Sequence, residues 1–278
     1  MLHEFFFSLS CLSCPSLLIC FMHTDWREKV VLITGASSGI GRALSVELGR
    51  RGARLGLLAR RADALEELVL EVEGAGGGAL ALQADVKDAG AVRAAADTLR
   101  ERFGPVDVLI ANAGVGATTH ARDLRAEEVA EVININLLGA VNSVTAVVPE
   151  MISRGRGQLV AISSLAAYRG LPKSGAYCAS KAALSAFFES LRLDLRGAGV
   201  DVTIIHPGFI KTPLTAGRHS QMPYLMELQA ATLKIVRAIE ARKKSYAFPW
   251  QLASIVRAAL LMPNFLYDRI AVRNSFRE

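Results

Sequence analysis

The fold of this chain is decided by residues 30–41, which read VVLITGASSGIG. The first four residues are apolar and mostly β-branched, which is typical of a strand buried in a parallel sheet. The next eight form a glycine-rich turn, and the apolar spacing over residues 42–51 predicts a helix. Glycines allow the backbone to approach a pyrophosphate closely, and the amides at a helix N-terminus face that anion. The order of strand, glycine-rich turn and helix therefore predicts a dinucleotide-binding site over residues 34–41.

Short apolar runs and helix-length segments continue to alternate along the chain. Strands are expected at residues 30–33, 54–59, 79–84, 106–111, 158–163 and 200–206. Helices are expected at residues 42–51, 62–73, 89–103, 125–151 and 176–196. This alternation requires right-handed crossovers and a parallel sheet with helices on both faces. The predicted fold class is α/β, with a Rossmann-type doubly wound parallel sheet in a single domain.

Residues 163–181, SSLAAYRGLPKSGAYCASK, contain the second informative feature. Tyr177 and Lys181 are four residues apart, so their side chains share one face of a helix. An ammonium group beside a phenol favours the phenolate and lowers the pKa of the tyrosine toward neutrality. Tyr177 is therefore predicted to exchange a proton with an alcohol or carbonyl oxygen. The spacing alone occurs by chance in many helices, so this interpretation depends on the accompanying motifs.

Together these motifs resemble the short-chain dehydrogenase/reductase family, in its compact single-domain branch. The resemblance covers residues 29–212 approximately, with the motifs in the family's order and spacing. The resemblance rests on the glycine-rich turn at 34–41, Asn112-Ala113-Gly114, Ser164, Tyr177 with Lys181, and Pro207-Gly208. The resemblance implies an oxidoreductase that transfers a hydride between a nicotinamide cofactor and a carbonyl or a primary or secondary alcohol. It also implies a homodimer or homotetramer.

The resemblance further implies a catalytic set of four residues. Tyr177 would protonate the substrate oxygen, while Lys181 would lower the pKa of the tyrosine and bind the nicotinamide ribose. Ser164, thirteen residues before Tyr177, would position the substrate oxygen, with its neighbour Ser163 as the competing candidate. Asn136 would hold a water molecule in a proton relay to the lysine.

The residues after the second strand indicate which cofactor is used. A carboxylate at this place binds the ribose 2′-hydroxyl of NAD, whereas an arginine accommodates the 2′-phosphate of NADP. The sequence has Arg60 and Arg61 here, with no acidic residue before Asp63. The planar fork of Arg60 suits a phosphate group, so NADP(H) is preferred over NAD(H). The alternative is that both arginines are solvated residues that open a helix.

Further residues after the strands complete the predicted cofactor site. By resemblance, Asp85 and Val86 would lie near the adenine ring, and Thr212 would contact the nicotinamide carboxamide. The full predicted set is Thr34, Gly35, Ser37, Ser38, Gly39, Ile40, Gly41, Arg60, Asp85, Val86, Asn112, Ala113, Gly114, Tyr177, Lys181, Pro207, Gly208 and Thr212. No metal site is predicted, because the five histidines are scattered without paired ligand spacing.

Composition agrees with one large domain and excludes several classes of protein. The chain has 278 residues, of which 51% are hydrophobic and 21% charged, so a large core is available and global disorder is excluded. The net charge of +6 is spread along the chain, and basic residues do not alternate with aromatic ones. Nucleic-acid binding is therefore not predicted.

The family resemblance thins after Thr212, where the substrate is selected. Residues 213–223 resemble a loop over the active site, and residues 252–262 and 265–272 are strongly apolar. Three interpretations remain open: a cap over a hydrophobic substrate pocket, a basic amphipathic edge on an anionic membrane surface, and core packing with an oligomer interface. Residues 22–212 are expected to form the dinucleotide-binding catalytic domain, and residues 213–278 the substrate loop and C-terminal helices of the same domain.

Residues 5–21 form an apolar stretch with three cysteines and no preceding lysine or arginine. A signal peptide needs a positive leading region, and a spanning helix needs about 20 apolar residues. A start of translation at Met22 is favoured over a membrane anchor at residues 1–21. That start leaves Cys178 alone, in agreement with a reducing compartment. The predicted location is cytoplasmic, with attachment to a membrane as the alternative.

Two other functions remain open besides the leading interpretation, an NADP(H)-dependent reductase or dehydrogenase for a small hydrophobic substrate. One is a membrane-associated reductase of lipid metabolism. The other is a non-catalytic NADP(H)-binding sensor, which the complete set of Asn136, Ser164, Tyr177 and Lys181 argues against.

Overall fold

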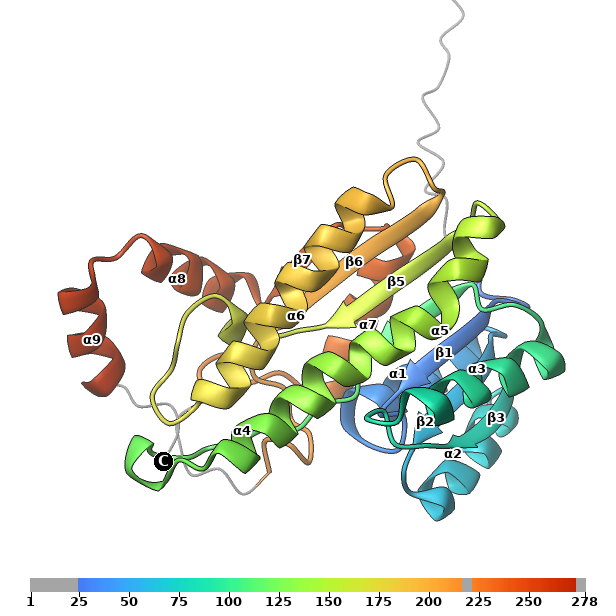
Figure 1. The fold of residues 1–278 in the computed structure, drawn as a ribbon, viewed down its shortest axis with the longest axis horizontal. Helices are drawn as coiled ribbons and strands as arrows, with labels where there is room; N and C mark the ends of the chain where they lie inside the picture. The colour runs from blue at the N-terminus through green and yellow to red at the C-terminus, as the bar shows by residue number, and fades with distance from the viewer. Residues whose placement is uncertain (1–24, 217–221, 274–278) are drawn as a thin grey trace, which may run out of the picture.

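The computed structural model of the protein describes residues 25–216 and 222–273. The apolar extension at residues 1–21 and the proposed start at Met22 lie outside the described residues, as do residues 217–221 of the predicted substrate loop. Within the described part, helices enclose a single sheet (Figure 1).

Seven parallel strands form this sheet. They are β1 (Val30–Thr34), β2 (Arg54–Ala59), β3 (Gly78–Gln83), β4 (Val108–Ala111), β5 (Gly157–Ile162), β6 (Val200–Pro207) and β7 (Ser245–Phe248). Their spatial order is β3-β2-β1-β4-β5-β6-β7, and every neighbouring pair is parallel. The chain runs outward from β1 to β3, returns to the centre and continues from β4 to β7. Such a reversal leaves a crevice at the carboxyl ends of β1 and β4, where ligands bind in open α/β sheets.

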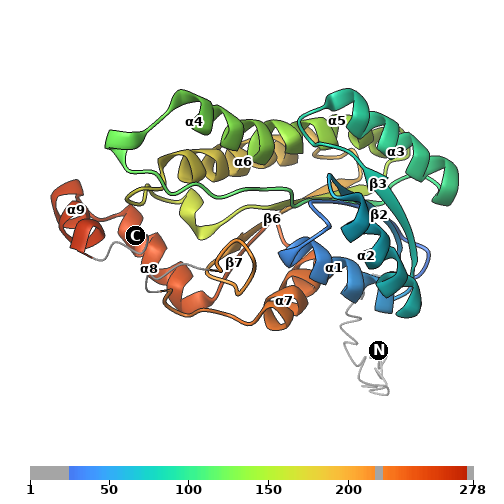
Figure 2. The same ribbon diagram turned by 90° about the horizontal axis from the view of Figure 1, so that it is seen from below.

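The helices cover both faces of the sheet. They are α1 (Gly39–Arg50), α2 (Ala62–Gly74), α3 (Ala89–Phe103), α4 (Ala126–Ile133), α5 (Gly139–Ser153), α6 (Gly175–Asp194), α7 (Leu228–Glu240), α8 (Trp250–Leu260) and α9 (Asn264–Arg273). Figure 2 shows α3, α4, α5 and α6 along one face and α1, α2 and α7 along the other. Because successive side chains of a strand point to opposite faces, Val31 and Ile33 of β1 join one core and Leu32 joins the other.

The structure confirms the predicted Rossmann-type doubly wound parallel sheet. Two elements differ from the expectation. The expected helix over residues 125–151 is divided into α4, a π-helical segment η2 (Asn134–Leu138) and α5. The sheet also gains β7, an edge strand of four residues paired with β6. A strand this short, flanked by basic residues on one side and Pro249 on the other, gives no clear periodic signal in the sequence.

One helical stretch of the described residues, Ala126–Ser153, is long and apolar enough to cross a membrane, and 44% of its most apolar window is buried. The core helix of a folded domain passes the same test. Here Val144, Val147 and Met151 are buried in the core beside the sheet. The apolar character of this stretch is therefore explained by packing within the domain.

Candidate active site

A cavity of about 890 Å³ lies at the carboxyl ends of the strands. Residues that follow β1, β2, β3, β4, β5 and β6 all line it, which is the position expected for a ligand in this fold. Most of the predicted site residues meet there. They are Gly35, Ser37, Ser38, Gly39, Ile40, Arg60, Asp85, Val86, Asn112, Ala113, Gly114, Ser164, Tyr177, Lys181, Pro207, Gly208 and Thr212.

Two predicted cofactor residues, Thr34 and Gly41, do not line the cavity but lie at the two ends of the glycine-rich turn. The Thr34 hydroxyl accepts hydrogen bonds from the amides of Asn112 and Ala113, both at 3.1 Å. The Asn112 side chain in turn donates to the carbonyl oxygens of Thr34 at 2.9 Å and Gly35 at 3.2 Å. A Cβ on Gly41 would lie 2.4 Å from the Gly35 oxygen. These residues hold the shape of the turn.

The turn itself fits the phosphates of a dinucleotide. Gly35 and Gly39 have φ angles of 65° and 54°, the left-handed region that favours glycine. A Cβ on Gly35 would lie 2.8 Å from the Cα of Ala113, so a larger residue would displace the loop after β4. Ser38 precedes α1 and makes no side-chain capping bond. The first amides of α1 therefore face the cavity, where an anion binds well.

Two arginines lie at the end of β2. Arg60 has an exposed side chain, and its Nη1 lies 4.0 Å from Oδ2 of Asp85. Arg61 reaches over the glycine-rich turn, where its Nη2 donates to the carbonyl oxygen and the hydroxyl of Ser37, both at 3.1 Å. The sequence prediction selected Arg60 alone for the cofactor. Arg61 is the one that contacts the glycine-rich turn, and its position directly after Arg60 was the only signal for it.

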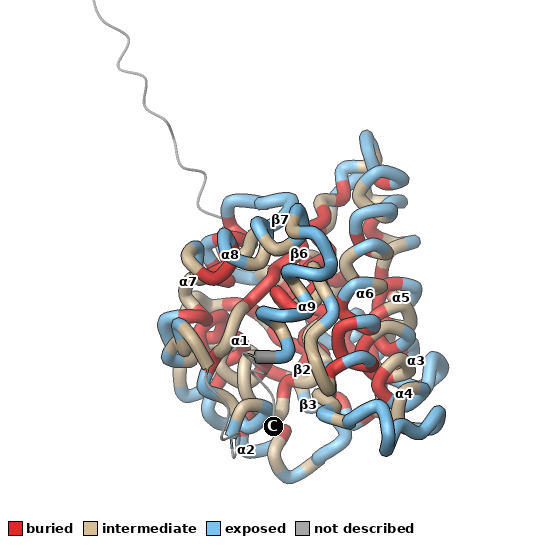
Figure 3. The backbone as a smooth tube through the Cα atoms, turned by 90° about the vertical axis from the view of Figure 1, so that its left-hand side faces the viewer, coloured by how far each residue is buried: buried red, intermediate tan, exposed pale blue. Residues whose placement is uncertain are grey.

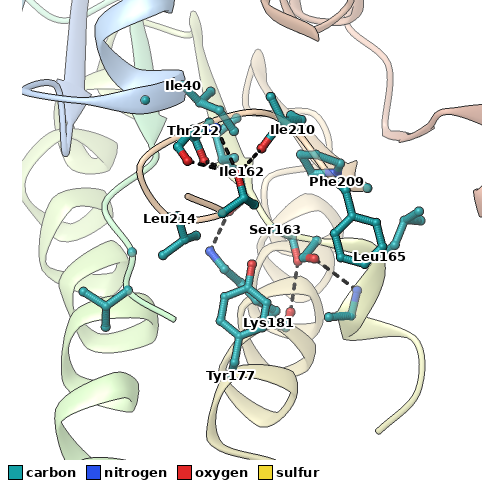
Figure 4. A pocket seen from close by; sticks show the side chains of 18 of the residues that line it. Ile40, Ile162, Ser163, Leu165, Tyr177, Lys181, Phe209, Ile210, Thr212 and Leu214 are labelled. Carbon is teal, nitrogen blue, oxygen red and sulfur yellow. Dashed lines mark hydrogen bonds between the residues drawn. The ribbon is translucent and has the colours of Figure 1, made fainter. Parts of the chain in front are cut away.

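Tyr177 and Lys181 are buried near the start of α6, and both side chains point into the cavity (Figure 4). The Nζ atom of Lys181 lies 5.9 Å from the centroid of the Tyr177 ring and donates to the carbonyl oxygen of Ile162 at 2.9 Å. Burial lowers the pKa of Lys181 from 10.5 to about 8. The side chain therefore remains mostly protonated at neutral pH, and its positive charge stays beside the phenol.

The two neighbouring serines after β5 have different partners. The Ser163 hydroxyl is directed toward α6, where it donates to the Lys181 carbonyl oxygen at 3.1 Å and lies 2.7 Å from the Ser185 hydroxyl. The Ser164 hydroxyl oxygen accepts from the amide of Ala166 at 3.1 Å. This bond orients the Ser164 side chain but does not use its hydroxyl proton. The Ser164 hydroxyl can therefore donate a hydrogen bond within the cavity, whereas the Ser163 hydroxyl is bonded to α6.

Asn136 is fully buried in η2 and does not line the cavity. Its side-chain amide donates to the Val115 carbonyl oxygen at 3.0 Å and to the Ser180 hydroxyl at 2.9 Å. Its side-chain oxygen accepts from the Val115 amide at 2.8 Å. The side chain thus connects the loop after β4 with α6. The relay predicted for Asn136 has to use one of its oxygens, since both amide hydrogens are occupied.

The segment after β6 closes the cavity on the side of the glycine-rich turn. Thr212 is half-buried, and a Cβ on Gly39 would lie 3.5 Å from the Cβ of Thr212. His206, at the end of β6, has its Nδ1 3.4 Å from the Ser164 carbonyl oxygen and its ring 5.0 Å from Tyr168. Burial lowers the pKa of His206, so this histidine is neutral at pH 7. It supports the backbone of Ser164.

The far end of the cavity is apolar, and α8 and α9 form one of its walls. The sequence prediction gave a cap over a hydrophobic pocket as one of three interpretations, and the segments that it named, residues 252–262 and 265–272, contain the residues of α8 and α9 that line the cavity. The apolar lining residues of this end are Leu165, Leu171, Pro172, Phe209, Leu214, Pro223, Leu252, Ile255, Val256, Ala258, Ala259, Met262, Ile270 and Ala271.

The described part of the chain contains no cluster of side chains that could hold a metal ion. Within residues 25–216 and 222–273, no three His, Cys, Asp or Glu side chains are grouped to hold a metal ion. His206 and His120 lie far apart in sequence and have separate partners.

Comparisons with known proteins agree with this geometry. The family model for short chain dehydrogenases matches residues 29–223. An uncharacterized oxidoreductase of Myxococcus xanthus (strain DK1622) is 45% identical over 249 residues, which cover 90% of this chain and 98% of that protein. The 11-beta-hydroxysteroid dehydrogenase A of Sesamum indicum is 34% identical, over 88% of this chain and 69% of its own.

A solved structure extends the comparison to three dimensions. The alcohol dehydrogenase from the archaeon Thermococcus sibiricus, complexed with 5-hydroxy-NADP, superposes with a TM-score of 0.72 and 28% identity. The superposition covers 79% of this chain and 95% of the archaeal one. The chain therefore belongs to the short-chain dehydrogenase/reductase family, whose members are oxidoreductases that use a nicotinamide cofactor.

Proposed function

We propose that the protein is an NADP(H)-dependent oxidoreductase that interconverts a carbonyl and a primary or secondary alcohol on a small hydrophobic substrate. One observation carries this proposal. Ser164, Tyr177 and Lys181 line a single cavity that has the glycine-rich turn at one end and an apolar wall at the other. The groups that handle an oxygen atom thus lie between a place for a dinucleotide and a place for an apolar molecule.

The residues of the chain have distinct tasks in this reaction. The bound nicotinamide supplies or accepts the hydride. The Tyr177 hydroxyl gives the substrate oxygen a proton during reduction and removes it during oxidation. The buried ammonium of Lys181 favours the phenolate form of Tyr177, and the Ser164 hydroxyl donates a hydrogen bond to the same substrate oxygen.

Two arginines support the choice of NADP(H). Arg60 and Arg61 lie at the end of β2 beside Ser37, the place at which a 2′-phosphate is recognised in this fold. The carboxylate of Asp85 lies 4.0 Å from Arg60 and partly offsets the positive charge of that arginine. Arg61 forms no ion pair with a carboxylate among the described residues, so it is expected to contribute more than Arg60 to binding of the 2′-phosphate. The archaeal alcohol dehydrogenase with bound 5-hydroxy-NADP agrees with this choice.

The cofactor is tested with kcat/KM for NADPH and NADH in the wild type, Arg60→Ala, Arg61→Ala and the control Arg93→Ala. Arg93 is exposed on α3, outside the lining of the cavity. Loss of a charged hydrogen bond costs about 1.5–3 kcal/mol, so NADPH efficiency should fall about tenfold or more in Arg61→Ala, with NADH unchanged. A wild type that prefers NADH would refute the cofactor assignment.

The reaction is tested on a panel of aldehydes and ketones of increasing size. Turnover should increase with apolar size and disappear in Tyr177→Phe, because the phenylalanine keeps the ring but has no transferable proton. Binding of NADPH without turnover of any panel member would favour the sensor. The relative from Sesamum indicum, named 11-beta-hydroxysteroid dehydrogenase A, agrees with an apolar substrate.

Attachment to a membrane is the second candidate, and one observation favours it. Leu261, Phe265 and Val272, at and around α9, are 89%, 78% and 73% exposed. Sedimentation with anionic lipid vesicles, comparing the full chain with a chain that starts at Met22, tests this candidate. If neither chain sediments, attachment to a membrane is refuted and the cytoplasmic location remains the proposal. In the leading proposal, residues 22–212 and 213–278 form one domain of a homodimer or homotetramer, which analytical ultracentrifugation would measure.

A further inference from the structure

The C-terminal cap, defined as residues 250–273 with α8 and α9, contributes little to the core of the protein. Its buried side chains are Leu252 and Ala253 near the start of α8, and no described residue after Ala253 is buried. Figure 3 shows α9 as mostly exposed backbone. Residues 264–272 of this ten-residue helix bury no side chain, so hydrophobic packing does not hold α9 in place. Specific polar contacts must therefore fix α9.

Arg169 makes these contacts from the loop between Ser164 and α6. Its Nη1 donates to the carbonyl oxygens of Ala259 and, at 3.0 Å, of Met262. Its Nη2 donates to the side-chain oxygen of Asn264 at 2.9 Å. The guanidinium carbon lies 3.8 Å from the centre of the Tyr267 ring. One side chain thus contacts the end of α8, the turn after it and the first half of α9.

A second contact runs in the opposite direction. The Tyr267 hydroxyl on α9 donates to the carbonyl oxygen of Gly170 at 2.5 Å. Burial raises the pKa of Tyr267, so its proton is retained for this bond. The two contacts join the same short loop to the same helix.

The chemistry of arginine suits this position. The last carbonyls of a helix have no partner within the helix and carry partial negative charge. The guanidinium group offers several N–H donors in one plane and can also stack on an aromatic ring. Arg169 does both: it donates to the carbonyl oxygens at the end of α8 and stacks on the Tyr267 ring. A lysine has a compact charge and no planar fork, so it cannot make the same set of bonds.

We propose that Arg169 is the positioning residue that fastens the C-terminal cap over the cavity and thereby sets selectivity for the apolar part of the substrate. Ile255, Met262 and Ile270 of the cap line the cavity, so their positions depend on how the cap is held. Arg169 also lines the cavity itself, but it acts on the apolar part of the substrate through the side chains of the cap that it holds. The proposal rests on the proposed function for its substrate, whereas the fastening itself can be measured without turnover.

The fastening is tested by hydrogen–deuterium exchange on the full chain without substrate. Exchange of the α9 amides should be about tenfold or more faster in Arg169→Ala than in the wild type, because charged hydrogen bonds of about 1.5–3 kcal/mol are lost. Arg169→Lys should lie close to Arg169→Ala. The matched control is Arg269→Ala, which removes the same charge from the exposed surface of α9 and should leave exchange unchanged.

A second variant keeps the proposal testable if Arg169→Ala does not fold. Tyr267→Leu removes the stacked ring and the hydroxyl from the outer helix and should also speed exchange of α9. Exchange of the strand β1 should be unchanged in every variant. Unchanged exchange of α9 in both Arg169→Ala and Tyr267→Leu would overturn the proposal.

Kinetics with NADPH then test selectivity. For the largest apolar substrate, KM should rise about tenfold in Arg169→Ala, whereas kcat/KM for a short aldehyde should remain within about threefold of the wild type, since the loss is confined to the cap. An equal loss for both substrates would overturn the selectivity assignment, as would a loss confined to carboxylate-bearing substrates. If the wild type turns over no substrate, the proposed function fails while the exchange result on Arg169 still stands.

Discussion

Lys181 shows how a single residue acquires its chemistry from burial. Its ammonium group lies beside Tyr177 and donates to the Ile162 carbonyl oxygen, in a place with little access for water. Burial lowers the pKa of this lysine to about 8. The charge needed beside the phenol is therefore present at neutral pH and disappears in mildly alkaline solution.

We expect kcat/KM for carbonyl reduction to fall as the pH rises through about 8, because Lys181 then loses its proton. The measurement is a pH profile from about 6 to 10 with a fixed ketone and NADPH. Ser164→Ala is the control: it should lower the rate about 100-fold and keep the same alkaline limb. A rate that rises through pH 8 would show that Lys181 is not the titrating group.

Two glycines provide a matched pair at the same scale. A Cβ on Gly41 would lie 2.4 Å from the Gly35 oxygen and 2.6 Å from the Asn112 side chain, whereas a Cβ on Gly74 meets nothing within 4 Å. Gly41→Ala should lose NADPH binding and destabilise the fold by about 1–3 kcal/mol through overpacking. Gly74→Ala, at the end of α2, should bind normally and be more stable by about 0.5–1 kcal/mol. NADPH titration and urea unfolding measure both, and similar effects in the two variants would contradict this account.

At the scale of elements, the π-helical segment η2 explains how Asn136 reaches both the loop after β4 and α6. One extra residue in the turn rotates the side chains that follow it, and such segments are frequent at functional sites. Ser180 of α6 completes the arrangement. Its hydroxyl accepts from the Asn136 amide and donates to the Tyr177 carbonyl oxygen at 2.8 Å. The three elements around Tyr177 are thus joined by buried hydrogen bonds.

Ser180→Ala should lower the free energy of unfolding by about 1–3 kcal/mol, because a buried amide hydrogen of Asn136 loses its acceptor. The kcat should fall as well, since Tyr177 loses a backbone contact. Ser190→Ala, on the exposed side of the same helix, should stay within about 0.5 kcal/mol of the wild type. Urea unfolding at neutral pH gives both values. Equal stability of the two variants would show that the bond from Asn136 contributes nothing.

At the scale of the whole molecule, the buried charge of Lys181 makes global stability depend on pH. The pKa of this lysine is about 8 in the folded protein and 10.5 when exposed, so between these values the unfolded chain binds more protons. Unfolding is therefore disfavoured as the pH rises from about 8 to about 10.5. The burial of the ammonium opposes folding most at neutral pH.

Compared with Lys181→Met, the wild type should gain stability across this pH window, by on the order of 3 kcal/mol in total. The difference in the free energy of unfolding between the two proteins is the quantity to follow, because other titrating groups cancel. Urea unfolding at pH 7, 8.5 and 10 measures it. A difference that does not change with pH would contradict the burial of a charged Lys181.

Much of this architecture could be predicted from the sequence because its signals are local. The glycine-rich turn, the strands predicted at residues 30–33 and 54–59 and the pair Tyr177–Lys181 each depend on spacing within about one helix or strand. The preference for Ser164 over Ser163 followed from the spacing to Tyr177 in the family that the sequence resembles. Since the order of strand, turn and helix repeats, the parallel sheet and the place of the cavity also followed.

Other features were decided only by the tertiary structure. Whether Thr34 and Gly41 touch the cavity or support the turn depends on where Asn112 lies, far along the chain. The contact of Arg169 with Ala259 joins residues 90 positions apart, and no local periodicity encodes such a pair. The strand β7 exists because the edge of β6 is available to it. Backbone periodicity therefore determined the elements and the pairing of Tyr177 with Lys181, whereas long-range packing and hydrogen bonding determined what surrounds them.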